Sequence, residues 1–152
     1  MSVEMKIKGL MIDPVSNMPI IILKNGDGNS VLPIWVGIFE ANAIAMQLED
    51  IVSPRPMTHD LLKNVIEGLQ AEVRRIEITD LKDNTFFAAI HLGHGEADLV
   101  VDARPSDAMA LALRAAAPIF VDAKVLSKSE APDDPGAGET ERLRRWLETV
   151  DP

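Results

Sequence analysis

The sequence predicts an α+β domain made of two tandem βββα units, with a further helix connecting them. Short segments with strand-like apolar alternation come in two groups of three, a helical apolar pattern follows each group, and the two halves resemble each other. We expect the strands to form a mixed or antiparallel sheet that tends toward a pseudo-barrel, with each half covered by its own helix. The two halves are expected to pair about a pseudo-twofold axis.

The first unit begins with three predicted strands. Alternation of apolar and polar residues places them at 4–12, 19–25 and 31–36, and Asn25-Gly26-Asp27-Gly28 is typical of the turn between the last two. A helix is predicted over 38–49. Its apolar stripe consists of Ile38, Ala41, Ile44, Ala45 and Leu48. The segment Ser53-Pro54-Arg55-Pro56 then breaks the helical pattern.

The connecting helix begins at Thr58, and Gly68 lowers the helix propensity where its pattern stops. The stripe that we expect to be buried consists of Leu61, Leu62, Val65, Ile66 and Leu69. The second unit follows with predicted strands at 72–80, 85–92 and 97–103. A helix over 106–116 and a short strand at 119–121 complete the predicted core.

Three matches in the same order indicate an internal duplication. The turn Asp13-Pro14-Val15-Ser16-Asn17-Met18 corresponds to Asp80-Leu81-Lys82-Asp83-Asn84-Thr85, and Gly26-Asp27-Gly28 corresponds to Gly93-His94-Gly95. The helical string 42–48 corresponds to 107–113. We expect Asp13 and Asp80 to be structural, because the side chain of Asp in such turns bonds to the local backbone.

The composition changes once, near residue 126. We therefore predict a domain over 1–126, a flexible linker over 127–138 that is rich in Pro and Gly, and an amphipathic helix over 139–152. The apolar stripe of that helix consists of Leu143, Trp146, Leu147 and Val150. It is expected to dock on its own domain or on a neighbouring copy, and recognition of a separate protein is the alternative.

Charge and cysteine content exclude several classes of protein. With 15 Lys and Arg against 24 Asp and Glu, the net charge of -9 excludes a broadly basic surface for nucleic acid, so any phosphate contact must be local. The absence of Cys excludes disulfides, thiolate zinc sites and a cysteine nucleophile. Since no long apolar run occurs, we expect neither a signal peptide nor a membrane span, and a cytoplasmic location.

Three strings of the sequence closely resemble the bifunctional nuclease family. They are LPIWVGIFEANAIA (32–45), RPMTHDLLKNVIEGL (55–69) and DARPSDAMALALR (102–114). The resemblance covers about residues 5–125 and implies a nuclease that hydrolyses phosphodiester bonds of DNA and RNA. Ala103 stands where the common wording of the family has Ser, which removes one hydroxyl near the expected site.

The residues in these strings include the groups that metal-assisted hydrolysis requires. Oxygen ligands for a divalent ion, Mg²⁺ or Mn²⁺, are expected from Glu40, Asp60, Asp102 and Asp107. Phosphate is expected to bind Arg55 and Arg104 together with Thr58 and Ser106 at two helix starts. His59, with Asp60 and Asp107, is the candidate for proton transfer. No organic cofactor is expected, because no dinucleotide or phosphate loop is present.

The same residues also have structural interpretations. Thr58 and Ser106 are typical N-caps, and Asp60 and Asp107 in the first helical turn complement the helix dipole. The two arginines would pair with these carboxylates and lock the helix starts together in a rigid polar joint. In that case, a hydrogen bond in the joint would satisfy the imidazole of His59.

Two functions therefore stay open. One is a metal-assisted nuclease with nucleic acid as its substrate, and the other is a non-catalytic oligomeric module for regulation or protein interaction. A homo-oligomer, a dimer or higher, is expected in either case, because small domains often complete their cores against a copy.

Overall fold

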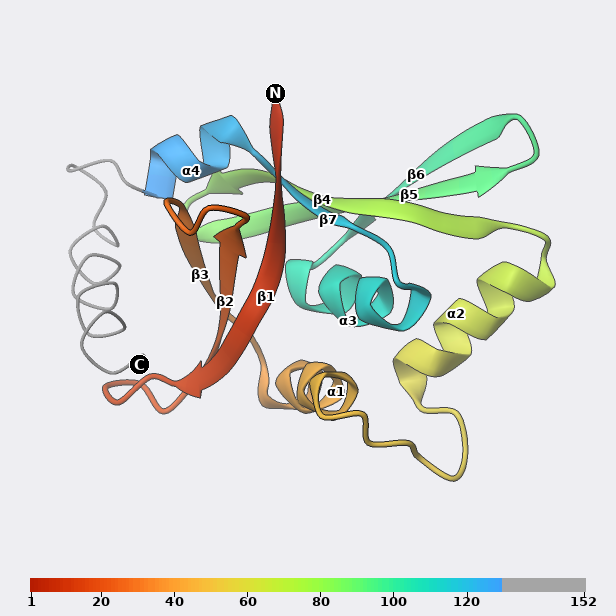
Figure 1. The fold of residues 1–152 in the computed structure, drawn as a ribbon, viewed down its shortest axis with the longest axis horizontal. Helices are drawn as coiled ribbons and strands as arrows, with labels where there is room; N and C mark the ends of the chain where they lie inside the picture. The colour runs from red at the N-terminus through yellow and green to blue at the C-terminus, as the bar shows by residue number, and fades with distance from the viewer. Residues whose placement is uncertain (130–152) are drawn as a thin grey trace.

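A computed structural model describes residues 1–129 of the chain. These residues form an α+β fold of four helices and a seven-stranded mixed sheet (Figure 1). The elements in chain order are β1 (Ser2–Ile12), β2 (Pro19–Asn25), β3 (Val31–Trp35), α1 (Ile38–Leu48), α2 (Thr58–Gly68), β4 (Glu72–Lys82), β5 (Thr85–His94), β6 (Ala97–Ala103), α3 (Pro105–Ala115), β7 (Ile119–Asp122) and α4 (Ala123–Ser129). None of these helices is long and apolar enough to cross a membrane.

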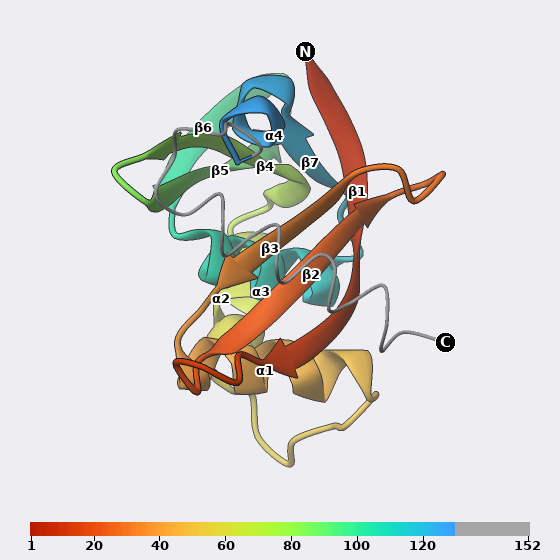
Figure 2. The ribbon, with the colours of Figure 1, turned by 90° about the vertical axis from the view of Figure 1, so that its left-hand side faces the viewer.

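The short strand β7 lies at the centre of the sheet. The strand order is β3-β2-β1-β7-β4-β5-β6, in which β7 runs antiparallel to β1 and parallel to β4, and all other pairs are antiparallel. Figure 2 shows that the sheet is strongly twisted, so that β1–β3 cross the direction of β4–β6 steeply. Within the described residues β3 and β6 remain edges and the sheet does not close, so the expected pseudo-barrel is wrong.

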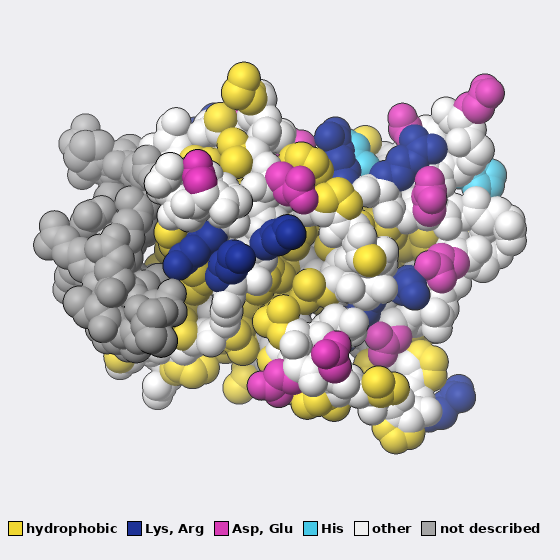
Figure 3. Space-filling model, viewed as in Figure 1, with side chains coloured by type: hydrophobic (Ala, Val, Ile, Leu, Met, Phe, Trp, Pro, Cys, Tyr) yellow, Lys and Arg dark blue, Asp and Glu magenta, His cyan; other side chains and the backbone are white. Residues whose placement is uncertain are grey.

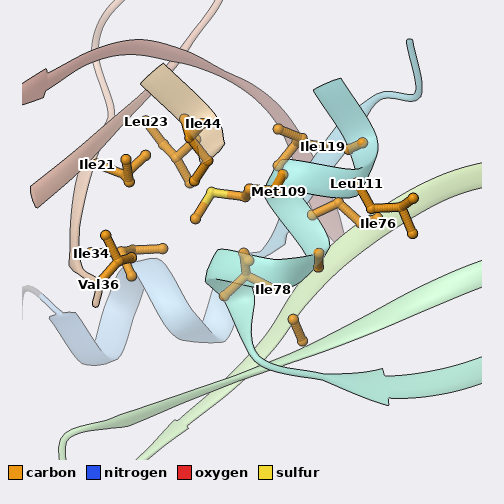
Figure 4. Packing of buried hydrophobic residues seen from close by; sticks show 14 of the residues in the cluster. Ile21, Leu23, Ile34, Val36, Ile44, Ile76, Ile78, Met109, Leu111 and Ile119 are labelled. Carbon is orange, nitrogen blue, oxygen red and sulfur yellow. The ribbon is translucent and has the colours of Figure 1, made fainter. Parts of the chain in front are cut away.

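Helix α3 lies at the centre of the hollow side of this twisted sheet. It contacts α1, α2, β4 and β5, and in Figure 1 α1 lies below it, α2 to its right, and β4 and β5 above it. Met109 and Leu111 on α3 are fully buried, and Figure 4 shows Met109 between Leu23 and Ile44 on one side and Ile76 on the other. One continuous core therefore joins both halves of the sheet through α3.

The predicted strands and helices of the two units are confirmed to within a few residues at their ends. The predicted turn after β2 is also present, because the N–H of Gly28 donates to the carbonyl of Asn25 at 3.0 Å and Gly28 has a φ of 76°. Asp13 accepts hydrogen bonds from the backbone N–H of Val15 at 3.0 Å and from the indole of Trp35 at 2.9 Å. Asp13 is thus a structural turn residue, as expected.

The two βββα units share their unusual backbone conformations. Asn17 and Asn84, which match in the sequence, have φ values of 63° and 62°. The matched glycines Gly28 and Gly95 have φ values of 76° and 61°. Equivalent turns therefore use the left-handed region, where Asn and Gly cost least. That the units arose by duplication stays a prediction.

The buried face of α2 differs from the prediction. His59 and Ile66 face the core, whereas the rest of the predicted stripe is exposed to solvent. The exposed members of that stripe are Leu61, Leu62, Val65 and Leu69. The prediction of a buried stripe is wrong for these four residues, because α2 packs on α3 and β4 through the adjacent side of the helix.

A short helix, α4, continues directly from β7 and was not predicted. Val125 in this helix is fully buried in the core. The first residues of the predicted linker, 127–129, belong to α4. The remainder of the linker and the predicted C-terminal helix over 139–152 lie outside the described residues.

Candidate active site

The start of α3 places charged side chains beside the end of β6. Arg104 is the N-cap in an extended conformation, and Pro105 occupies the first helical turn, where its missing N–H costs nothing. Ser106 is buried inside the first turn and is not the cap, which corrects the expected N-cap role. Asp107 follows in the same turn, where a carboxylate complements the helix dipole.

The start of α2 is held by its own aspartate. Met57 is the N-cap, so the expected capping by Thr58 is also wrong. The carboxylate of Asp60 accepts a hydrogen bond from the backbone N–H of Met57 at 3.0 Å, as in a capping box. This first turn directs His59 inward, where its side chain is 10% exposed.

The starts of α2 and α3 meet through these side chains. Nε2 of His59 lies 3.0 Å from Oδ1 of Asp107. Nε of Arg104 donates to Oδ2 of the same carboxylate at 2.9 Å, and Nη2 of Arg104 lies 2.8 Å from that oxygen in an ion pair. Nη2 of Arg104 also lies 3.7 Å from Oε2 of Glu40 on α1. We call Glu40, His59, Arg104 and Asp107 the polar cluster. It brings three helices and the end of β6 to one point.

The charges of the polar cluster stabilise one another. Burial works to raise the pKa of Asp107, but the hydrogen bonds from Arg104 and His59 outweigh it, so the pKa of Asp107 lies below its ordinary value. The hydrogen bond to Asp107 raises the pKa of Arg104. Asp107 is therefore ionised and Arg104 protonated at neutral pH, and the guanidinium stays largely in water at 65% exposure.

Asp60 belongs to a second joint, which the sequence analysis did not identify. Nε of Arg114 donates to its Oδ1 at 2.7 Å, and the guanidinium also donates to the carbonyls of Ala110 at 2.9 Å and Ala43 at 3.0 Å. The hydrogen bond from the N–H of Met57 is the main cause that lowers the pKa of Asp60, and Arg114 lowers it further. The sequence feature that could have indicated this joint is Arg114, an arginine within a helix whose other residues are mostly apolar.

Three expected site residues lie away from the polar cluster. The side chain of Ala103 packs against the core, so Asp102, one residue earlier on β6, points to the opposite face of the sheet. Arg55 and Thr58 are exposed, and within residues 1–129 no hydrogen bond or ion pair of their side chains joins them to the cluster, although Thr58 is the neighbour of His59 in the chain. The expected arrangement of two arginines around one phosphate therefore does not form in this structure.

The carboxylates do not form a metal centre. Among residues 1–129 no group of three or more His, Asp or Glu side chains is placed to hold a metal ion. The carboxylate of Asp60 is paired with Arg114, and those of Glu40 and Asp107 are paired with Arg104. Asp102 points to the opposite face of the sheet. As arranged, the four expected ligands do not fit a divalent cation, and we assign no chemical step to one.

Comparison with known proteins agrees with the resemblance in the sequence. Residues 21–134 match the family model of the bifunctional nuclease domain. An uncharacterized protein of Mycobacterium tuberculosis strain H37Rv is 33% identical over 98% of this chain and 95% of its own length. Bifunctional nuclease 1 of Oryza sativa subsp. indica is 30% identical over 69% of this chain, and bifunctional nuclease 1 of Arabidopsis thaliana is 30% identical over 74%. The matches span 33% and 35% of these plant proteins.

Proposed function

Because the chain belongs to the bifunctional nuclease domain family, we propose that it is a nuclease that hydrolyses phosphodiester bonds of DNA and RNA at the polar cluster. The observation that carries this proposal is the 3.0 Å contact between Nε2 of His59 and Oδ1 of Asp107, with Arg104 on the same carboxylate. This contact places a group for proton transfer beside a fixed positive charge. Both groups would accelerate phosphodiester hydrolysis.

His59 would serve as the general base. An ionised carboxylate only accepts hydrogen bonds, so Asp107 fixes the neutral imidazole with its proton on Nε2. The other ring nitrogen, Nδ1, is then the one that takes a proton from an attacking water or hydroxyl. Asp107 also stabilises the imidazolium that forms, as in other His–carboxylate pairs.

Arg104 would bind the phosphate. Its Nε and Nη2 contact Asp107, and no contact within residues 1–129 uses Nη1. The N-terminus of α3, an 11-residue helix, adds a favourable dipole for an anion at the same place. Glu40 competes with the phosphate for Nη2, so substrate must displace its carboxylate.

The test is cleavage of short labelled DNA and RNA strands by purified variants. His59→Gln and Asp107→Asn should each lower kcat by about 10²-fold or more, the usual contribution of a general base. Arg104→Ala should mainly raise KM. Glu40→Gln is the matched control, since it removes a carboxylate from the cluster without touching the imidazole, and should keep kcat and leave KM unchanged or lower.

One contrary outcome and one further measurement complete this test. Full activity in both His59→Gln and Asp107→Asn would show that the observed cleavage comes from another enzyme. Metal assistance stays a prediction, and cleavage measured with a chelator and with added Mg²⁺ or Mn²⁺ tests it separately. Activity that survives chelation agrees with the absence of a preformed metal centre in the described residues.

A non-catalytic oligomeric module is the second candidate. It is favoured by the mutual neutralisation of the charges in the polar cluster, which is what a rigid joint between helices requires. In that case the same variants would have no cleavage to lose. His59→Gln and Asp107→Asn would instead lower the free energy of unfolding by about 1–3 kcal/mol, as when a buried polar group loses its partner. Arg104→Ala would lower it by about 1 kcal/mol or less, because the guanidinium is largely exposed.

A further inference from the structure

Helix α2 presents an apolar face to solvent. Four apolar residues of this face are exposed to solvent. Their exposed fractions are 56% for Leu61, 39% for Leu62, 49% for Val65 and 68% for Leu69. Such a stripe on an amphipathic helix is normally buried, and a large exposed apolar patch marks an interaction surface. Within residues 1–129, α2 instead packs against the core through its other side, which carries His59 and Ile66.

The apolar surface continues into the segment that leads to α2. Ile51, Val52 and Met57 in this segment are exposed, and in Figure 3 apolar side chains lie along the lower part of the visible face, with acidic and basic side chains among them. Together with the four residues of α2 they make seven exposed apolar residues between positions 51 and 69, a concentration that marks an interaction surface.

The face of α2 itself carries no charge, although the exposed Arg55 lies in the segment before it. Besides the four apolar residues of the stripe, this face contains only Thr58 and Gly68, although 26% of the chain is charged. A phosphate backbone or a charged peptide would find no ionic partner on this face. An occupant with a matching apolar helix face fits it best.

The stripe is complementary to itself. In an antiparallel pair of α2 helices centred on Val65, Val65 meets its own copy, Leu62 lies beside the partner's Leu69, and Leu61 lies beside the partner's Gly68. Among residues 1–129, a Cβ added at Gly68 would meet no atom within 4 Å beyond its chain neighbours and the backbone of its own helix, so this glycine leaves a notch in the face. We infer that a second copy of the chain packs α2 against α2 about a two-fold axis through Val65.

The mass of the full chain in solution at micromolar concentration tests this inference. The wild type should have twice the mass of one chain in sedimentation or light scattering. Val65→Lys and Val65→Asp should each halve that mass, because each places like charges opposite each other across the axis. An equimolar mixture of the two variants should restore the double mass, since Lys then meets Asp.

Gly68→Leu and Val15→Lys are the matched variants. Gly68→Leu fills the notch without touching its own fold and should also halve the mass, with an unchanged circular dichroism spectrum. Val15→Lys makes the same chemical change as Val65→Lys at a residue that is 89% exposed in the turn after β1, and should leave the dimer intact. A monomeric wild type would overturn the inference and leave the face to a different protein. So would a dimer that persists in Val65→Lys, or a mixture that stays monomeric.

Discussion

The guanidinium of Arg114 holds three helices together. It is 6% exposed and bonds to Asp60 at the start of α2, to Ala43 in α1 and to Ala110 in its own helix. Because Asp60 also fixes the backbone of Met57, the position of the first turn of α2 depends on this guanidinium. His59 lies in that turn, so Arg114 helps to keep the imidazole at Asp107.

Replacing Arg114 by Met should lower the free energy of unfolding by about 3 kcal/mol, the low end for a broken buried pair, because Asp60 retains some contact with water. Urea denaturation measures this loss. Lys63→Met is the control, since it removes an exposed pair with Glu67 at 3.8 Å and should cost about 0.5 kcal/mol or less. Equal losses in the two variants would contradict the role of Arg114.

The site residues that the sequence predicted best are those at helix starts. His59, Arg104 and Asp107 meet because both helices begin at one place, which the family strings and the helix signals located. Arg114 escaped prediction because its partners are distant in the sequence and two of them are backbone carbonyls. Asp102 was misplaced because its direction depends on which face of β6 meets the core.

At the scale of elements, one carboxylate attaches α4 to the sheet. Asp80 near the end of β4 is contacted by Nζ of Lys128 at 2.8 Å and of Lys124 at 4.0 Å, both from α4, and by Lys82 at 3.5 Å. The hydrogen bond from Lys128 is the main cause that lowers the pKa of Asp80 from 3.8 to about 2. The predicted turn role of Asp80 is met as well, through the N–H of Leu81.

This attachment should depend on pH. Because the pKa of Asp80 is lower in the folded state, its stabilisation is complete above about pH 5 and is lost as the pH falls through the unfolded value of 3.8 toward 2. Asp80→Asn should therefore be less stable than the wild type at neutral pH, with the two unfolding curves meeting near pH 2, and the amides of α4 should exchange faster. Asp83→Asn in the adjacent turn should leave both unchanged. A constant difference between pH 6 and pH 2 would contradict the attachment.

The sequence located α2 correctly but not its buried side. Periodicity shows that a stripe is apolar, and it does not show whether the partner of that stripe is the same chain or another. The buried side of α2 includes His59 and borders Lys63, residues that a pattern of apolar positions ranks as exposed. The strands were easier, because alternation and turn residues fix their ends locally.

At the scale of the whole molecule, charge limits how nucleic acid can bind. The net charge is -9, and Figure 3 shows basic and acidic side chains interspersed over the visible face. Arg104 is the cation that the polar cluster offers to a phosphate. Binding should therefore use few ionic contacts and depend weakly on salt.

The salt dependence of KM for a short single strand measures the number of these contacts. With one or two phosphates neutralised, the logarithm of the affinity should fall with the logarithm of the salt concentration with a slope of about -1. Arg104→Ala should flatten this slope. A slope near -4 or steeper in the wild type would reveal a basic surface that the charge distribution does not indicate.

The central place of β7 has a consequence for how the chain reaches its native state during synthesis. β1 leaves the ribosome first and β4 follows. Each lacks β7, its neighbour on one side, until residues 119–122 have been made. Before that point β1 pairs only with β2 and β4 only with β5, so each has one open edge, and the sheet is completed only when β7 joins them. A truncated mRNA would therefore yield a polypeptide in which β1 and β4 each expose an unpaired strand edge that can pair with other chains.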